Sequence, residues 1–141
     1  MTNSTTHERK SYIAELSKLV DAIETHKGAW IENAGGEETE PNVVQMPYVI
    51  SDQLAMQAMK FLYDHELIVV FDWVKWEEGR EFFKDNDPLK FSKLSKEWVL
   101  KLLTTIARND RFSDGAWAQL FESGDAQKLY RRLLEIEESH H

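Results

Sequence analysis

The chain has 141 residues, of which 42% are hydrophobic, 11% aromatic and none cysteine. This apolar content excludes a disordered chain and predicts one domain, while the lack of cysteine excludes disulfides, a thiolate nucleophile and cysteine-containing zinc sites. Lysine and arginine number 17 against 25 aspartates and glutamates, and the resulting net charge of −8 lacks the basic surface that direct nucleic-acid binding requires.

The first third of the chain predicts an amphipathic helix followed by a hairpin. Apolar residues recur at helical spacing over residues 12–23, and Gly28 is placed to end this helix. Residues 33–42 contain two glycines, three glutamates and a proline, which predicts an exposed acidic loop. The flanking segments 29–32 and 43–50 are rich in strand-forming residues and predict a short hairpin.

The middle of the chain predicts a second and a third helix. Ser51 is a favourable N-cap for a helix with apolar residues on one face. The apolar run 67–71 is short and β-branched, so we expect it to pair with the preceding strands in a small sheet. Asp72 then leads a segment of tryptophans, phenylalanines and glutamates that predicts a helix with an aromatic face, ending before Asp87.

The last third predicts three helices. Ser95 is positioned to cap a strongly apolar fourth helix. Ser113 or Asp114 is expected to cap a short helix that Gly124 closes, and Asp125 to cap the last helix. The fold class predicted is therefore mainly α, a single compact domain of five or six helices with a small β-hairpin or short sheet.

The domain boundaries follow from composition. We expect a flexible N-terminus over residues 1–6, a single helical domain over 7–138 and a flexible C-terminus over 139–141. The final two histidines carry no functional weight, because such a pair is also typical of a purification tag. No stretch is apolar enough to cross a bilayer and residues 1–10 are polar, so we expect no membrane association and a cytoplasmic location.

Familiar catalytic and cofactor motifs are absent from the sequence. The six glycines form neither a dinucleotide fingerprint nor a phosphate-binding loop. His7, His26 and His65 have no second histidine at zinc-ligand spacing, so we expect neither a metal nor a cofactor. Adjacent Glu77 and Glu78 point to different faces of a helix, as on a solvated surface. These absences favour a non-enzymatic function.

One polar cluster remains as a candidate site, where the fourth helix ends in alternating charges. In a functional interpretation, the guanidinium groups of Arg108 and Arg111 hold a carboxylate or phosphate. In a structural interpretation, Asp114 caps the next helix and the arginines pair with nearby acids. We favour the structural interpretation, and we expect the tryptophans to be core anchors rather than a ligand cage. The candidate residues are Asp72, Arg108, Asp110, Arg111 and Asp114, with the aromatic residues Trp73, Trp76, Phe112 and Trp117 beside them.

The segment containing this cluster also carries a family resemblance. Residues 102–124 read Leu-Leu-Thr, then an arginine, Asp-Arg-Phe, an acidic residue with glycine, and Phe-Glu-Ser-Gly, which resembles the signature of the bacterial domain of unknown function 6508 family. Phe-Asp-Trp at 71–73 and Pro-Tyr at 47–48 resemble the same family. Ser113 stands where cysteine is common in that family and Val74 where proline often occurs, and the first departure argues against an essential thiol. The resemblance implies a compact, mainly helical fold and no particular activity.

Three functions are compatible with the sequence. We expect first a non-enzymatic protein-interaction module, because acidic residues dominate the N-terminal half and favour a basic protein partner. The second is an acidic inhibitor or mimic that offers the loop 37–40 to a basic nucleic-acid-binding protein. The third is an enzyme or binder that uses the region of Asp72, Asp110 and Arg111 on a small anionic ligand. The oligomeric state is left open.

Overall fold

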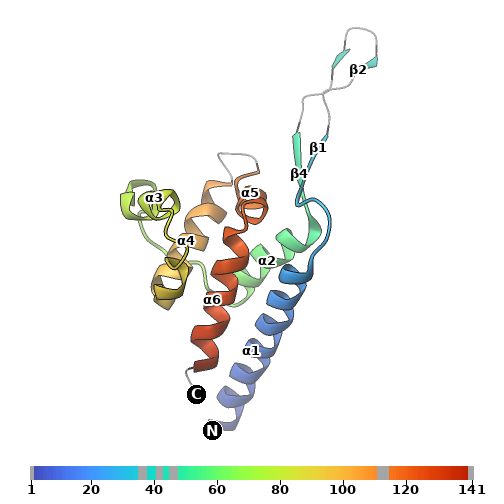
Figure 1. The fold of residues 1–141 in the computed structure, drawn as a ribbon. Helices are drawn as coiled ribbons and strands as arrows, with labels where there is room; N and C mark the ends of the chain where they lie inside the picture. Colours follow the sequence, from blue (N-terminus) through green and yellow to red (C-terminus); the bar gives the residue numbers. More distant parts are fainter. Residues whose placement is uncertain (1, 35–37, 41–42, 45–47, 111–114, 140–141) are drawn as a thin grey trace.

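The computed structural model describes residues 2–34, 38–40, 43–44, 48–110 and 115–139. Within these residues the protein is mainly helical, as the sequence predicts (Figure 1). The helices are α1 (Thr2–Thr25), α2 (Gln53–Asp64), α3 (Glu77–Lys84), α4 (Lys96–Asn109), α5 (Ala116–Glu122) and α6 (Asp125–Ser139), with 3₁₀ turns η1 (Trp73–Lys75) and η2 (Phe91–Lys93).

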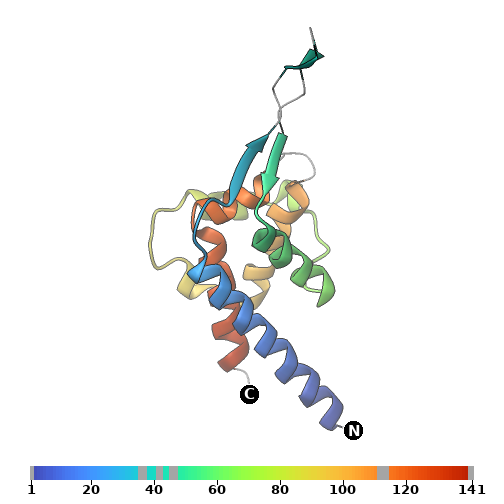
Figure 2. The ribbon, with the colours of Figure 1, turned by 90° about the vertical axis from the view of Figure 1, so that its right-hand side faces the viewer.

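Two short antiparallel strand pairs connect α1 to α2. Strand β1 (Ile31–Ala34) pairs with β4 (Tyr48–Ser51), and β2 (Glu38–Glu40) pairs with β3 (Val43–Val44). Figures 1 and 2 show the two pairs one after the other along a narrow arm that projects from the helices. We call residues 31–51 the arm.

The arm differs from the sequence prediction in one respect. Strands β1 and β2 take up part of the segment 33–42, which was expected to be a loop throughout. Residues 35–37 and 41–42 lie outside the described residues, and the exposure of this segment stays a prediction. The difference arises because glutamate and threonine in β2 are compatible with a strand when a partner such as the valines of β3 follows within a few residues.

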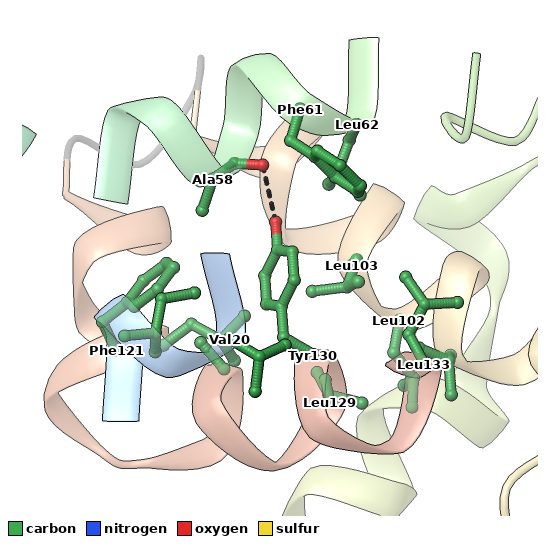
Figure 3. Close-up of a cluster of buried hydrophobic side chains, with 14 of the residues drawn as sticks. Val20, Ala58, Phe61, Leu62, Leu102, Leu103, Phe121, Leu129, Tyr130 and Leu133 are labelled. Atoms are coloured by element: carbon green, nitrogen blue, oxygen red, sulfur yellow. Dashed lines mark hydrogen bonds between the residues drawn. The ribbon is translucent and has the colours of Figure 1, made fainter. Parts of the chain in front are cut away.

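The core is formed where α1, α4 and α5 pack against α6 (Figure 1). Leu16, Val20 and Ile23 are spaced by four and three residues, and they place one buried stripe of α1 on the core. Tyr130 of α6 lies at the centre of the buried cluster and is fully buried (Figure 3). Around it the figure shows apolar side chains from α1, α2, α4, α5 and α6.

Helix α2 closes the core through its backbone as well as its side chains. Ala55 and Ala58 are fully buried, and their small side chains allow the helix to approach closely. The Tyr130 hydroxyl donates a hydrogen bond to the Ala58 carbonyl at 2.7 Å (Figure 3), and the Trp117 indole N–H donates to the Ala55 carbonyl at 2.7 Å. Both large aromatic side chains are therefore buried with their polar atoms satisfied.

Near the C-terminal end of α6, a buried glutamate contacts residues of two other helices. Glu137 is 2% exposed, and Lys96 at the start of α4 approaches its Oε2 atom at 3.1 Å. Arg9 of α1 donates to the Glu137 backbone carbonyl at 3.1 Å. Burial, with a smaller contribution from Glu137, raises the pKa of Tyr12 above its ordinary range. The charge of Glu137 is thus balanced by a cation, as a buried carboxylate requires.

The structure corrects three predictions about helix boundaries. Asp52, not Ser51, caps α2, since its Oδ1 atom accepts from the Leu54 N–H at 2.8 Å while Ser51 ends β4. The expected third helix is divided at Trp76, whose backbone is not helical, into η1 and α3. Helix α1 begins at Thr2, ten residues before the apolar repeat from which it was predicted, because polar residues without a breaker extend an established helix at little cost; the flexibility expected of residues 1–6 stays a prediction.

The apolar run 67–71 forms no strand, so the prediction that it joins a sheet is wrong. The Val69 N–H instead donates to the Thr104 hydroxyl of α4 at 3.0 Å, and the Leu67 N–H donates to the Leu62 carbonyl at 2.8 Å. These bonds fasten the run to the helices. Two caps expected in the last third of the chain are confirmed: the Ser95 hydroxyl accepts from the Trp98 N–H at 3.2 Å, and Gly124 after α5 has a φ of +87°. Asp125, expected as the cap of the last helix, is instead the first residue of α6.

Candidate functional site

The structure assigns a local structural role to one member of the predicted polar cluster. Asp110 follows α4, and its Oδ1 atom accepts the backbone N–H of Trp117 in the first turn of α5 at 3.0 Å. Gly115, the N-cap residue of α5, offers no side chain for this purpose, so Asp110 supplies an acceptor to the first turn of α5, and the capping expected of Ser113 or Asp114 stays a prediction. Arg111, Phe112, Ser113 and Asp114 lie outside the described residues.

The remaining polar candidates are not joined to Asp110. Asp72 is exposed at the start of η1, and Arg108 is half-buried in the last turn of α4. Within the described part of the chain, no hydrogen bond or ion pair links either residue to Asp110. Since Arg111 lies outside that part, the proposed pair of guanidinium groups stays a prediction.

The predicted aromatic residues divide into two groups. Trp117 is fully buried in the main core. Trp76 is half-buried at a second place, where its ring lies 5.0 Å from that of Trp98 and 5.4 Å from that of Phe71. The ammonium of Lys101 lies 5.7 Å from the Trp76 ring centroid, which places a cation of this chain against the ring. Trp73 is half-buried in η1.

The base of the arm is a site that sequence reasoning missed. Trp30, immediately before β1, is 8% exposed, and its ring stacks on His26 at 3.7 Å and contacts Phe121 at 4.8 Å. Its backbone N–H donates to the Glu122 carboxylate at 2.8 Å, and its carbonyl accepts from the Asp52 N–H at 2.9 Å. We call these five residues the base clamp.

The base clamp connects both strands of the arm to helices. Trp30 ties β1 to α5 through Glu122. Asp52, after β4, caps α2 and also pairs with His26 at 3.2 Å between Nε2 and Oδ2. The sequence pattern placed Trp30 inside the strand-forming segment 29–32, whereas its partners in the structure are up to 92 residues away. Local pattern therefore gave no sign of the clamp.

Two of the hollows among the described residues lie against helices α1, α2 and α6. One, of about 370 Å³, lies between α1 and α2 and is lined by Leu19, Leu54 and Phe61 with charged residues around them. The other, of about 240 Å³, lies between η2 and α6 and is lined by Phe91 and by three basic side chains of α6. The two hollows therefore differ in charge, since two acidic and two basic side chains line the first, whereas three basic side chains and one acidic side chain line the second.

The described residues contain neither a metal-binding cluster nor a membrane-spanning helix. Among these residues, histidine, aspartate and glutamate side chains form no group of three or more that could hold a metal ion. None of the helices in the same ranges combines the length and the apolar composition that crossing a bilayer needs.

Comparison with known proteins identifies the family. The model of the family of unknown function DUF6508 matches residues 8–139, so the chain belongs to this family, as the resemblance of residues 102–124 predicted. No curated protein and no solved structure matches the chain. Membership in this family brings no activity with it, and a function has to be argued from the arm, the base clamp and the hollows.

Proposed function

We propose that the protein is a non-enzymatic interaction module that presents its arm to a basic protein partner. The observation that supports this proposal is the projection of the arm from the helices (Figures 1 and 2) together with its composition. Residues 31–51 contain four glutamates and no lysine or arginine. A projecting segment of one charge sign attracts an oppositely charged surface and orients it on approach.

The base clamp supports the same proposal. A two-stranded hairpin is marginally stable in water by itself, so a projecting one needs an anchor. Trp30 and Asp52 supply hydrogen bonds from both sides of the arm base to the helices. An arm held in one direction loses less conformational freedom on binding than a free loop does. The anchored arm is therefore suited to binding.

The structural roles of Asp110 and Trp117 also favour an interaction module over a small-anion enzyme. Asp110 caps α5 and Trp117 fills the core, which accounts for two residues of the predicted cluster without a ligand. The third hypothesis from the sequence, which uses the region of Asp72, Asp110 and Arg111, consequently loses one of its candidate residues. Its remaining residues, Asp72 and Arg111 with the neighbouring Arg108, can be tested by thermal melts with a panel of anions.

The experiment is an affinity capture with a matched control. The wild type and a variant with Glu→Gln at 32, 37, 38 and 40 are immobilised, and a lysate of the source cells is passed over each at about 0.1 M salt. We expect basic proteins bound by the wild type to be absent from the variant. A second control carries the same four-charge change outside the arm, at Glu66, Glu78, Glu81 and Glu138, which are exposed.

The result that contradicts the proposal is equal retention by the wild type and the arm variant. If the captured partner binds nucleic acid and DNA competes for it, the module is the acidic mimic that the sequence allows. If DNA does not compete, the module binds its partner without imitating nucleic acid.

A further inference from the structure

The hollow between η2 and α6 carries an excess of positive charge on a chain whose net charge is −8. We call it the Phe91 cleft. Its volume is about 240 Å³, and its lining includes Lys128, Arg131 and Arg132 against one carboxylate, Glu135. The cleft is therefore of the opposite sign to the arm.

Two of these cations are available to a further carboxylate. The Lys128 ammonium lies 5.3 Å from the Phe91 ring centroid and has no carboxylate partner within the described residues. Arg132 donates its Nε–H to the Leu94 carbonyl at 2.9 Å, and its Nη1 atom is 3.6 Å from Glu135, a long and solvent-exposed contact. Arg131 is already bonded to Glu24 through its Nε atom at 2.8 Å.

A further cation lies against the Phe91 ring outside the lining of the cleft. The Lys90 ammonium is also 5.3 Å from the Phe91 ring centroid, so two cations share one ring. Lys90 donates to the carbonyls of Phe82 and Asp85 at 2.6 and 2.7 Å, which fixes its place. A carboxylate entering the cleft would meet Lys128 and Arg132, whereas Lys90 lines the neighbouring hollow together with Asp85 and Asp87.

We propose that the arm of one copy docks in the Phe91 cleft of a second copy, so that the protein assembles with itself. This inference rests on the proposed function and identifies the basic partner as another molecule of the same chain. Within one copy the arm points away from the helical body that contains the cleft (Figures 1 and 2), and the base clamp holds it there. The opposite charges can meet only between copies.

The lengths of the arm strands and of α6 allow the arm of one copy to dock on another. At about 3.4 Å per residue, β1 with its four residues is roughly 14 Å long and β2 with its three residues adds roughly 10 Å farther out along the arm (Figure 1), and α6 with its 15 residues is roughly 22 Å long. An arm can thus reach a cleft on the flank of a neighbouring helical body. If each copy inserts its arm into the other, two equal contacts close a symmetric dimer, whereas one-way insertion gives a chain of copies.

The test is sedimentation velocity of the full chain at about 0.05 M and about 0.5 M salt. We expect the wild type to assemble at low salt and to dissociate at high salt. Lys128→Gln with Arg132→Gln should weaken assembly at least roughly tenfold, and Lys128→Gln alone should weaken it less. Lys18→Gln with Lys60→Gln, which removes the same charge beside the α1 and α2 hollow, should leave assembly unchanged. Circular dichroism checks that each variant is folded.

A charge exchange identifies the two contacting surfaces. A copy with Lys128→Glu and Arg132→Glu, and a copy with the four arm glutamates changed to lysine, should each fail to assemble alone and should assemble when mixed. A wild type that is monomeric at low salt, or an assembly unaffected by the cleft substitutions, overturns the inference. If the chain is monomeric while the arm still captures a basic protein, only the self-assembly is refuted; if the arm captures nothing, the proposed function fails as well.

Discussion

Replacing Asp110 by alanine separates the structural from the ligand-binding interpretation of the predicted polar cluster. Its Oδ1 atom accepts the Trp117 N–H at 3.0 Å, one of the amides at the start of α5 that has no partner inside the helix. Leaving this buried donor unpaired costs about 1–3 kcal/mol. The carboxylate also lies at the end of α4, where its removal returns roughly 0.3–1 kcal/mol. We therefore expect Asp110→Ala to lower the free energy of unfolding by about 1–2 kcal/mol.

The assay is urea unfolding followed by circular dichroism and tryptophan fluorescence, with Asp110→Asn as the matched control. Asparagine keeps an acceptor oxygen and removes the charge, so its stability should stay within about 0.5 kcal/mol of the wild type. An alanine variant as stable as the wild type would refute the capping role. Equal losses in the two variants would show that the charge, not the hydrogen bond, stabilises the protein.

Three further predictions test the core and the aromatic surface. Trp117→Phe loses the indole hydrogen bond to Ala55 and leaves a small cavity, so the free energy of unfolding should fall by about 2–3 kcal/mol in urea titrations. Burial raises the pKa of Tyr130 well above its ordinary value, so the free energy of unfolding is unaffected by this group below about pH 10 and falls as the pH rises further, because only the unfolded chain then loses the proton. In urea unfolding at a series of alkaline pH values, Tyr130→Phe should make this fall shallower by about 1.4 kcal/mol per pH unit. Gly79→Ala places a Cβ atom 2.4 Å from the Trp76 ring, so the ring must move, and both the fluorescence spectrum and a stability loss of about 1–3 kcal/mol should report it.

Helical periodicity predicted the helical part of the fold well, because it reflects burial of one face. Leu16, Val20 and Ile23 repeat at helical spacing and are buried. Ser95 capped α4 as expected, since a cap depends on residues within one turn. The run 67–71 misled the prediction, because β-branched apolar residues suit a buried extended segment whether or not it has a strand partner.

The candidate site was less accessible from sequence, because its contacts join distant parts of the chain. Asp110 was expected to serve as a partner for an arginine, whereas its bond to Trp117 spans seven residues and no local pattern describes it. The Phe91 cleft combines a 3₁₀ turn with cations on α6 that are more than 35 residues away, and the bond from Arg132 to Leu94 spans 38 residues. Pairings of this kind depend on the packing of α6, which periodicity alone does not give.

The base clamp explains how an acidic hairpin can act at a distance from the helices. Trp30 is packed between His26 and Phe121, and its backbone N–H and carbonyl both bond to groups on the helical side of the arm. A hinge at this point would have to break two hydrogen bonds and expose a buried indole ring, which is costly compared with the thermal energy. The direction in which the arm leaves the helices is consequently set by residues that also pack on the core, so that under the proposed function the ordering cost of binding is met during folding rather than at the encounter with a partner.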